Sequence, residues 1–278
     1  MQTSQPTGTA APGATIRTLL EQDPVWGAYA LADLQPHMAH YCTWYVAEDA
    51  RGLALIYSGL SIPTLFTFGR VESVAAAVRQ IELPPRVYIT VREEHFPEVD
   101  RFYDFADDYR PMRRMRLPAT VNLLQSDHAA ERLTAASSEE LRRLYAHGGA
   151  FAPDAFDPGQ IDDGVFFALR DDQGGLTAAG GTHIVDWTAG IAAIGNMYTR
   201  PDQRSKGHAA AVLSAIVQTL RAGDVHTIVL NVDQRNTPAQ HLYERYGFVQ
   251  HCPYVEGIGK RRVNTETVSS IRSKEQQT

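Results

Sequence analysis

The residues with the clearest chemical potential lie in one short turn that follows Pro201. This turn presents two cationic side chains, Arg204 and Lys206, next to Gly207. After it, apolar side chains recur at helical spacing, at Ala209, Val212, Leu213, Ile216, Val217 and Leu220. The first NH groups of a helix have no partner within the helix, and the helix dipole favours negative charge there. The turn therefore predicts a site for an anion such as phosphate or pyrophosphate.

Two strands and a second helix must position this turn. The apolar run 191–195 predicts a strand that leads into it, and residues 230–233 predict another strand downstream. A helix is expected after Asn236, because a capping residue followed by Pro238 is typical of a helix start. Tyr243 lies about 10 Å further along the same face of that helix.

Both motifs resemble those of the GNAT superfamily of N-acetyltransferases. The spacing Arg204-x-x-Gly207-x-Ala209 resembles the family's loop for the pyrophosphate of acyl-CoA. Residues 236–248 match the family's N-x-x-A-x-x-L-Y-x-x-x-G-F helix at every position. The loop motif alone is weak, but the two motifs in the family's order make the resemblance specific for about residues 123–257. It implies an α/β (α+β) GNAT fold, with a mixed, mostly antiparallel sheet flanked by helices.

The resemblance also implies a site for acetyl-CoA as co-substrate, without a metal. In the family, the pantetheine arm enters where the strand expected at 191–199 splays from its parallel neighbour at a bulge. Gly195 and Asn196 suit such a bulge, because both tolerate positive φ better than most residues. Ser205 replaces a glycine that is common in the family, and we expect an ordinary negative φ for it. The implied cofactor-binding residues are Met197, Tyr198, Thr199, Arg204, Ser205, Lys206, Gly207, His208, Ala209 and Asn236.

Three residues are candidates for proton transfer. By resemblance, Tyr243 is the general acid that protonates the departing thiolate. Family members often place a carboxylate base on the strand before the loop, but residues 191–196 contain no Asp or Glu. His183 and Asp186, on the preceding predicted strand, are the candidate bases. Each also has a structural interpretation: a core aromatic for Tyr243, and hydrogen bonding within the fold for the other two.

Composition limits the other function classes. The chain has 278 residues, 44% hydrophobic and 21% charged, which is typical of a soluble globular protein with two domains. A net charge of −6 argues against general adhesion to nucleic acid or to an anionic membrane. Cys42 and Cys252 lie far apart and lack metal-ligand spacing, which fits a reducing cytoplasm. The longest apolar stretch is well short of the roughly 20 residues of a membrane span.

The predicted layout has four parts. Residues 1–14 are expected to be disordered, 15–120 to form an N-terminal α/β domain, 121–257 the GNAT domain, and 258–278 a flexible tail. The N-terminal domain is expected to contain helices at 16–20, 26–34 and 71–81 and strands at 41–47, 53–58, 65–68 and 87–91. This order resembles an incomplete GNAT unit that lacks the loop motif; an unrelated α+β cap is the alternative.

Three further segments carry expectations. The basic run 110–116 is interpreted as a solvated edge strand or linker, with a basic lip for acidic ligands as the alternative. A helix is predicted from Ser137 to about Tyr145, followed by a Gly-rich loop whose Phe151 and Phe156 are expected near the acceptor pocket. Residues 164–170 and 176–187 are predicted to form an antiparallel hairpin.

These features together predict an acyl-CoA-dependent N-acetyltransferase that transfers acetyl directly to a primary amine of a small molecule or peptide. One alternative is a glycine N-acyltransferase-like enzyme that uses another acyl-CoA. Another is a non-catalytic acyl-CoA-binding regulatory protein. The expected partner is a small-molecule amine, with neither nucleic acid nor membrane; the acceptor and the oligomeric state stay open.

Overall fold

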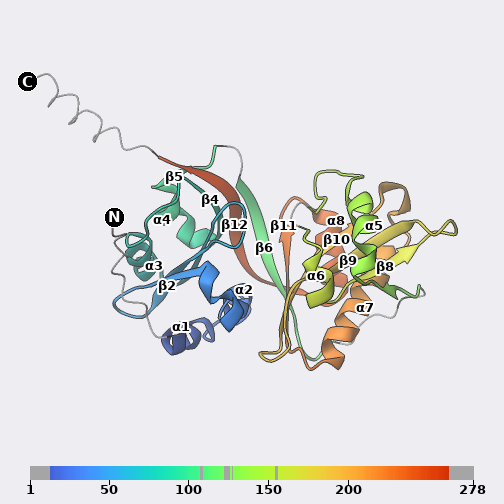
Figure 1. Ribbon diagram of the computed structural model, residues 1–278, viewed down its shortest axis with the longest axis horizontal. Coiled ribbons are helices and arrows are strands. Elements are labelled where there is room, and N and C mark those ends of the chain that lie inside the picture. The colour runs from blue at the N-terminus through green and yellow to red at the C-terminus, as the bar shows by residue number, and fades with distance from the viewer. Residues whose placement is uncertain (1–12, 107–108, 122–125, 127, 154–155, 263–278) are drawn as a thin grey trace, which may run out of the picture. The chain divides into compact units, whose positions relative to one another are not determined.

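The computed structural model describes residues 13–106, 109–121, 126, 128–153 and 156–262 (Figure 1). The chain forms two compact units: Tyr41–Tyr109 with the segment from Val255 onward, and Pro12–His40 with Arg110–Tyr254. Residues 1–12 of the predicted disordered N-terminus and 263–278 of the predicted tail lie outside the described residues.

The first unit is built on an antiparallel meander, as predicted, to which a parallel strand is added. The strand order is β1-β2-β3-β4-β12, with β3 and β4 parallel. Its elements are β1 (Cys42–Val46), β2 (Gly52–Tyr57), β3 (Thr64–Gly69), α3 (Val71–Val78), β4 (Arg86–Arg92), a 3₁₀ helix (Glu93–His95), α4 (Phe96–Asp100), β5 (Tyr103–Asp104) and β12 (Val249–Arg261), whose first residues belong to the second unit. Along β4, Val87, Ile89 and Val91 alternate inward, as a strand with one core-facing side requires.

The second unit has the predicted mixed α/β fold. Its strand order is β6-β11-β10-β9-β8-β7, and only β10 and β11 are parallel (Figure 1). Its elements are α1 (Gly13–Leu20), α2 (Ala28–Ala32), a 3₁₀ helix (Pro36–Tyr41), β6 (Tyr109–Leu117), β7 (Glu131–Arg132), a 3₁₀ helix (Ala135–Ser137), α5 (Ser138–Tyr145), α6 (Gly159–Asp163), β8 (Phe167–Arg170), β9 (Leu176–Asp186), β10 (Ile191–Thr199), a 3₁₀ helix (Pro201–Gln203), α7 (His208–Ala222), β11 (Thr227–Asp233) and α8 (Thr237–Arg245).

Two apolar clusters hold the helices of this unit on its sheet. The apolar stripe of α7, including Val212, Ile216 and Leu220, packs with residues of β10, β11 and α8. Leu141 and Tyr145 of α5 pack with residues of α6, β8 and β9 in a separate cluster. Each such buried side chain contributes about 1.5–3 kcal/mol to the free energy of folding relative to an exposed one.

Within the described residues, no helix combines the length and apolarity that crossing a membrane requires.

Two sequence expectations about this architecture are wrong. Strand β6, which contains the basic run, lies between β11 and β12, so it is neither an edge strand nor a linker. Arg114 of this strand is fully buried (0% exposed), with its guanidinium against the rings of Trp26, Tyr29 and Tyr254. At the ends of the described chain, Gly13 and Ala14 belong to α1, and residues 258–261 belong to β12, although both segments were expected to be flexible.

The N-terminal helices group with the second unit. Trp26 is fully buried, and its ring centroid lies 5.4 Å from that of Tyr254. Asp23 also forms an ion pair with His251, with 2.8 Å between Oδ1 and Nε2. The structure therefore places residues 13–40 with the unit that holds the two motifs, whereas the predicted range 15–120 places them with the strands of the first.

Candidate functional site

The site begins where two parallel strands diverge. β10 and β11 pair from Ile191 and Thr227 as far as Ile194 and Leu230. Both strands then continue, β10 to Thr199 and β11 beyond Leu230, without further pairing to each other among the described residues. The backbone groups that face this gap are therefore not used by the β10–β11 ladder, and an extended ligand can bind there as an added strand.

A bulge in β10 accompanies this splay. Gly195 pairs with Gly181 and Tyr198 with Ala179, so two residues of β10 lie opposite the single residue Gly180. Asn196, the first of the two, has a φ of 54°. The bulge predicted at Gly195 and Asn196 is therefore confirmed, and the left-handed conformation falls on the asparagine, which tolerates it better than most residues.

Two side chains outside the predicted site hold the bulge in place. The hydroxyl of Tyr145 donates to the Asn196 carbonyl at 2.9 Å, and Asn196 Nδ2 donates to Gln160 Oε1 at 2.8 Å. Tyr145 also contacts the ring of Phe156, with centroids 5.4 Å apart. Phe156 thus belongs to the aromatic cluster behind β10, whereas Phe151 of the same loop is 41% exposed.

The predicted anion turn leads from β10 into α7 through two left-handed residues. Ser205 has a φ of 61° and Gly207 a φ of 83°. The negative φ expected for Ser205 is therefore wrong: the chain must reverse from the 3₁₀ turn into the helix, and that reversal places Ser205 in the conformation that the family's glycine adopts freely. The side chains of Arg204 and Lys206 are exposed beside this turn.

A pair of histidines flanks the start of α7. His208 is the first residue of the helix, and its ring contacts His128 edge to face, with centroids 5.1 Å apart. Nε2 of His128 donates to the Lys206 carbonyl at 3.0 Å. Nδ1 of His208 is buried and has no hydrogen-bond partner among the described residues. Burial lowers the pKa of His208, and the positive charges of His128 and Lys206 lower it further.

The second motif is a capped helix with a buried tyrosine. Asn236 Oδ1 accepts a hydrogen bond from the Ala239 NH at 3.3 Å. Asn236 therefore caps the start of α8, as its place before Pro238 predicts. Tyr243 lies in the apolar cluster under α7, 7% exposed, with its ring centroid 6.0 Å from that of Phe248. Burial raises the pKa of Tyr243 to about 12, so its hydroxyl keeps its proton at neutral pH.

The two candidate bases occupy different places on β9. His183 is the extra residue at a register shift opposite Ala193 and Ile194, and its ring covers Gly195, where an added Cβ would lie 2.1 Å from Nε2. Asp186 lies at the hairpin end, where its carboxylate accepts NH hydrogen bonds from Thr188 at 3.0 Å and Ala189 at 2.9 Å. The structure therefore brings His183, and not Asp186, to the bulge.

Three residues absent from the sequence-based site join His183 there. Tyr29 of α2 shares a hydrogen bond with His183 Nδ1 at 3.0 Å and accepts one from Asn231 Nδ2 at 3.5 Å. Arg114 pairs with Asn231 across β6 and β11, and its Cζ lies 4.9 Å from the centre of the Tyr29 ring. These residues come from four separate segments, and only the basic run on β6 gave any signal of them.

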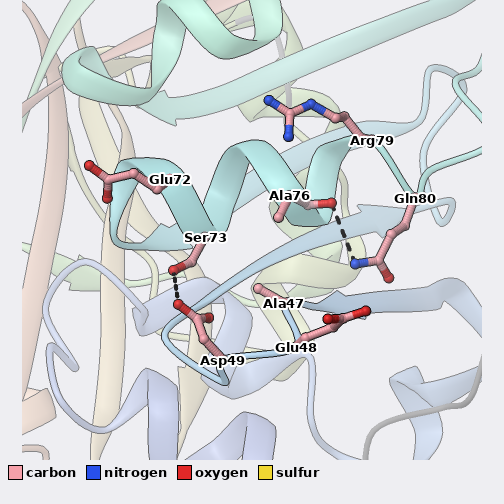
Figure 2. A pocket seen from close by; sticks show the side chains of 8 residues that line it. All are labelled: Ala47, Glu48, Asp49, Glu72, Ser73, Ala76, Arg79 and Gln80. Atoms are coloured by element: carbon pink, nitrogen blue, oxygen red, sulfur yellow. Dashed lines mark hydrogen bonds between the residues drawn. The ribbon is translucent and has the colours of Figure 1, made fainter.

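The first unit has a hollow of its own, lined by residues of the β1–β2 turn and α3. It measures about 500 Å³ and is lined by Ala47, Glu48, Asp49, Glu72, Ser73, Ala76, Arg79 and Gln80. Figure 2 shows the Asp49 side chain turned toward Ser73, whose hydroxyl donates to it at 2.7 Å; this bond and the Arg51 NH lower the pKa of Asp49. No residue of the predicted site lines this hollow.

Within the described residues, no group of three or more His, Cys, Asp or Glu is arranged to hold a metal ion.

Comparison with known families assigns the segment that carries both motifs. The sequence model of the acetyltransferase (GNAT) family matches residues 121–248. These residues form a GNAT-family acetyltransferase domain. The match covers the loop, both splayed strands and the α8 motif, so the GNAT resemblance of the sequence is confirmed, as is an acyltransferase class of activity. No curated protein matches the chain.

Solved structures resemble the chain over most of its length. A GNAT-family acetyltransferase from Novosphingobium aromaticivorans covers 86% of this chain and 97% of its own, at 16% identity and a TM-score of 0.56. A GCN5-related N-acetyltransferase from Kribbella flavida covers 92% and 96%, at 15% identity and a TM-score of 0.53. A Drosophila protein covers 90% and 97%, at 12% identity and a TM-score of 0.66. At these identities the likeness concerns the fold.

Proposed function

We propose that the protein is an acyl-CoA-dependent N-acetyltransferase that transfers acetyl from acetyl-CoA directly to a primary amine. The observation that carries this proposal is the splay of β10 from β11 beyond Ile194, with the bulge at Asn196 and the left-handed turn into α7. One continuous path thus joins unpaired strand backbone to a cationic helix start. Such a path suits an extended thiol arm that ends in a pyrophosphate.

The residues present fit acetyl-CoA. Thr199 Oγ1 and His208 Nδ1, at the two ends of the turn, are both buried without hydrogen-bond partners among the described residues. The backbone of β10 past the bulge would hold the arm, and the turn would hold the phosphates. Bound acetyl-CoA supplies an acetyl group activated as a thioester. The residues we propose to hold it are Met197, Tyr198, Thr199, Arg204, Ser205, Lys206, Gly207, His208, Ala209 and Asn236.

In the proposed reaction, the acceptor nitrogen attacks the thioester carbonyl, so that a C–N bond forms and the C–S bond breaks. Backbone NH groups at the bulge stabilise the negative charge that develops on the carbonyl oxygen. Tyr243 donates a proton to the departing sulfur, and its high pKa keeps that proton available at neutral pH. We assign the nitrogen's proton to His183, because this ring covers Gly195 whereas Asp186 caps the distant turn.

The test follows thiol release by purified protein supplied with acetyl-CoA and pools of amino acids, polyamines, aminoglycosides and peptides. Longer acyl-CoAs in parallel distinguish acetyl transfer from the glycine N-acyltransferase-like alternative. Tyr243→Phe is expected to lower kcat by at least tenfold with little change in acyl-CoA affinity. Tyr246→Phe is the matched control, because Tyr246 lies in the same apolar cluster and is equally buried.

The absence of a carboxylate on β10 before the bulge favours a second candidate, a non-catalytic acyl-CoA-binding protein. That candidate predicts tight acetyl-CoA binding without thiol release from any pool. It also predicts that Tyr243→Phe changes binding alone. Either result would refute the transferase.

A further inference from the structure

We propose that Tyr29 is a positioning residue for the reaction, because its hydroxyl oxygen accepts the Nδ1 proton of His183. Nε2 of the same ring is then the nitrogen that takes the proton of the amine. This inference rests on the proposed transferase function and adds a residue to the same site. It is carried by the hydrogen bond between the two side chains and by the contacts that hold them in place.

The two nitrogens of the His183 ring face different neighbours. Nδ1 lies 3.0 Å from the Tyr29 hydroxyl oxygen. Nε2 is the ring atom nearest to the place that a Cβ on Gly195 would occupy, at 2.1 Å. Gly195 begins the β10 bulge, next to the left-handed Asn196. His183 therefore connects the bulge, through one nitrogen, with α2 through the other.

Only one nitrogen of a neutral imidazole can accept a proton, because the other nitrogen already carries one. For Nε2 to accept the amine proton, the ring's own proton must be on Nδ1, and a hydrogen-bond acceptor beside Nδ1 selects that tautomer. Once Nε2 is protonated, both nitrogens are donors, and the charged ring strengthens its bond to that acceptor. The Tyr29 oxygen is at hydrogen-bond distance from Nδ1 and can serve in both states.

The proton transfers in this step balance without any proton from Tyr29. The lone pair of the amine forms the C–N bond, and the proton that the nitrogen loses moves to Nε2 of His183. The electron pair of the broken C–S bond stays on sulfur, which takes its proton from Tyr243. After the products leave, Nε2 gives its proton to water and Tyr243 regains one from water. Tyr29 keeps its own proton throughout and acts only through the ring of His183.

The fold fixes the place of Tyr29. Helix α2 packs against β9 and β10. Its other four residues are all buried: Ala28, Ala30, Leu31 and Ala32. Arg114 Cζ lies 4.9 Å from the centre of the Tyr29 ring, and Asn231 Nδ2 donates to the hydroxyl at 3.5 Å. A cation against the ring and a donor at the oxygen restrict the side chain, so its oxygen is in place before an amine binds.

Tyr29→Phe tests the proposal, because phenylalanine keeps the ring beside Arg114 and removes the acceptor oxygen. With an amine that gives thiol release, we expect kcat to fall at least about tenfold. The KM for acetyl-CoA should not change, because Tyr29 is not among the residues proposed to hold acyl-CoA. Tyr254→Phe is the matched control, because its ring also lies beside Arg114, at 5.7 Å from Cζ. It should keep the wild-type kcat.

A double-mutant cycle shows whether the loss acts through His183. His183→Gln removes the base and should lower kcat by about a hundredfold. Adding Tyr29→Phe to this variant should cause no further loss, because no imidazole remains to be positioned. A purely structural role of Tyr29 would lower kcat by the same factor in both backgrounds, and that result would overturn the proposal.

Nitrogen NMR of the protein with isotope-labelled histidine reads the tautomer directly at alkaline pH. The His183 signals are assigned by their loss in His183→Gln. The wild-type ring should carry its proton on Nδ1, and Tyr29→Phe should shift the population toward Nε2–H.

The outcomes separate this inference from the proposed function. A proton on Nε2 in the wild-type ring, or a full kcat in Tyr29→Phe, overturns the role of Tyr29 and leaves the transferase intact. Should Tyr29→Phe fail to fold, the wild-type tautomer alone decides. Absence of thiol release with every amine refutes the proposed function, and this inference falls with it.

Discussion

The hydrogen bond from Tyr145 to the β10 bulge allows a sharp test of how the bulge serves the site. Two buried tyrosines, Tyr145 and Tyr198, lie with ring centroids 6.0 Å apart. Each donates its hydroxyl to one backbone carbonyl, at 2.9 Å to Asn196 and at 2.7 Å to Gly148. Phenylalanine at either position keeps the ring and removes one hydrogen bond. The two variants are therefore chemically matched and differ only in what the lost bond was holding.

The expected cost to stability is similar in both variants. A buried carbonyl left without its partner costs about 1–3 kcal/mol, and the half-buried carbonyl of Gly148 falls in the lower part of that range. For a protein of this size, 2 kcal/mol lowers the Tm by roughly 4–8 °C. Thermal unfolding followed by circular dichroism should therefore report comparable losses for Tyr145→Phe and Tyr198→Phe.

Acyl-CoA binding is expected to distinguish the two variants. Tyr145 holds the carbonyl of Asn196, whose left-handed conformation costs about 1–2 kcal/mol for an ordinary residue and less for asparagine. If the bulged conformation becomes about 1 kcal/mol less favourable, its population falls several-fold, and the Kd for acyl-CoA rises by the same factor. Calorimetric titration should therefore give a Kd about three- to tenfold higher for Tyr145→Phe and unchanged for Tyr198→Phe, because the contact proposed for Tyr198 is made by its backbone and not by its hydroxyl. Equal affinities in the two variants would refute the role assigned to the bulge.

Three further predictions concern the turn and the ring over the bulge. Gly195→Ala should lower kcat/KM at least tenfold, because the added Cβ would lie 2.1 Å from His183 Nε2 and displace the ring; unaltered kinetics would contradict its placement. Ser205→Val should lower the free energy of unfolding in urea by about 1–2 kcal/mol, because a β-branched residue resists the φ of 61°, whereas Ser205→Gly should be tolerated. The pKa of His208 is lowered, so its ring is neutral at pH 7 and becomes positively charged only as the pH falls through that pKa. Acyl-CoA affinity should rise as the ring gains this charge. In a calorimetric pH series, His208→Gln should lack this rise in affinity. Identical series for the two proteins would exclude His208 from the anion site.

Local chemistry made the turn, the helix after it and the capped α8 predictable from sequence. The turn, the helix after it and the capped α8 each depend on residues within a few positions of one another, so spacing alone locates them. The bulge was expected from the resemblance to the GNAT family, and asparagine at 196 suits it because this residue tolerates positive φ. The φ of Ser205 was not, because the path of the chain between β10 and α7 requires it against the local preference.

Long-range pairing placed the residues that the sequence did not reveal. Four arginines in the run 110–116 favoured exposure, yet β6 lies inside the sheet and the rings of Trp26, Tyr29 and Tyr254 lie against Arg114. Tyr29 meets His183 across 154 positions of sequence. No periodicity encodes such a contact, because it depends on which strands become neighbours.

The two sides of the site are therefore specified in different ways. The proposed donor side is a contiguous run, Thr199 to Ala209, together with helix α8. The family match over residues 121–248 includes both. The residues around His183 come from α2, β6, β9 and β11, and Tyr29 and Arg114 lie outside that match. The segment proposed to bind acyl-CoA can thus be recognised by its motif, whereas residues that meet only in the folded chain cannot. This difference explains why the family match gives the reaction class but not the acceptor: Tyr29 and Arg114, which meet the residues near the bulge only in the folded chain, lie outside it.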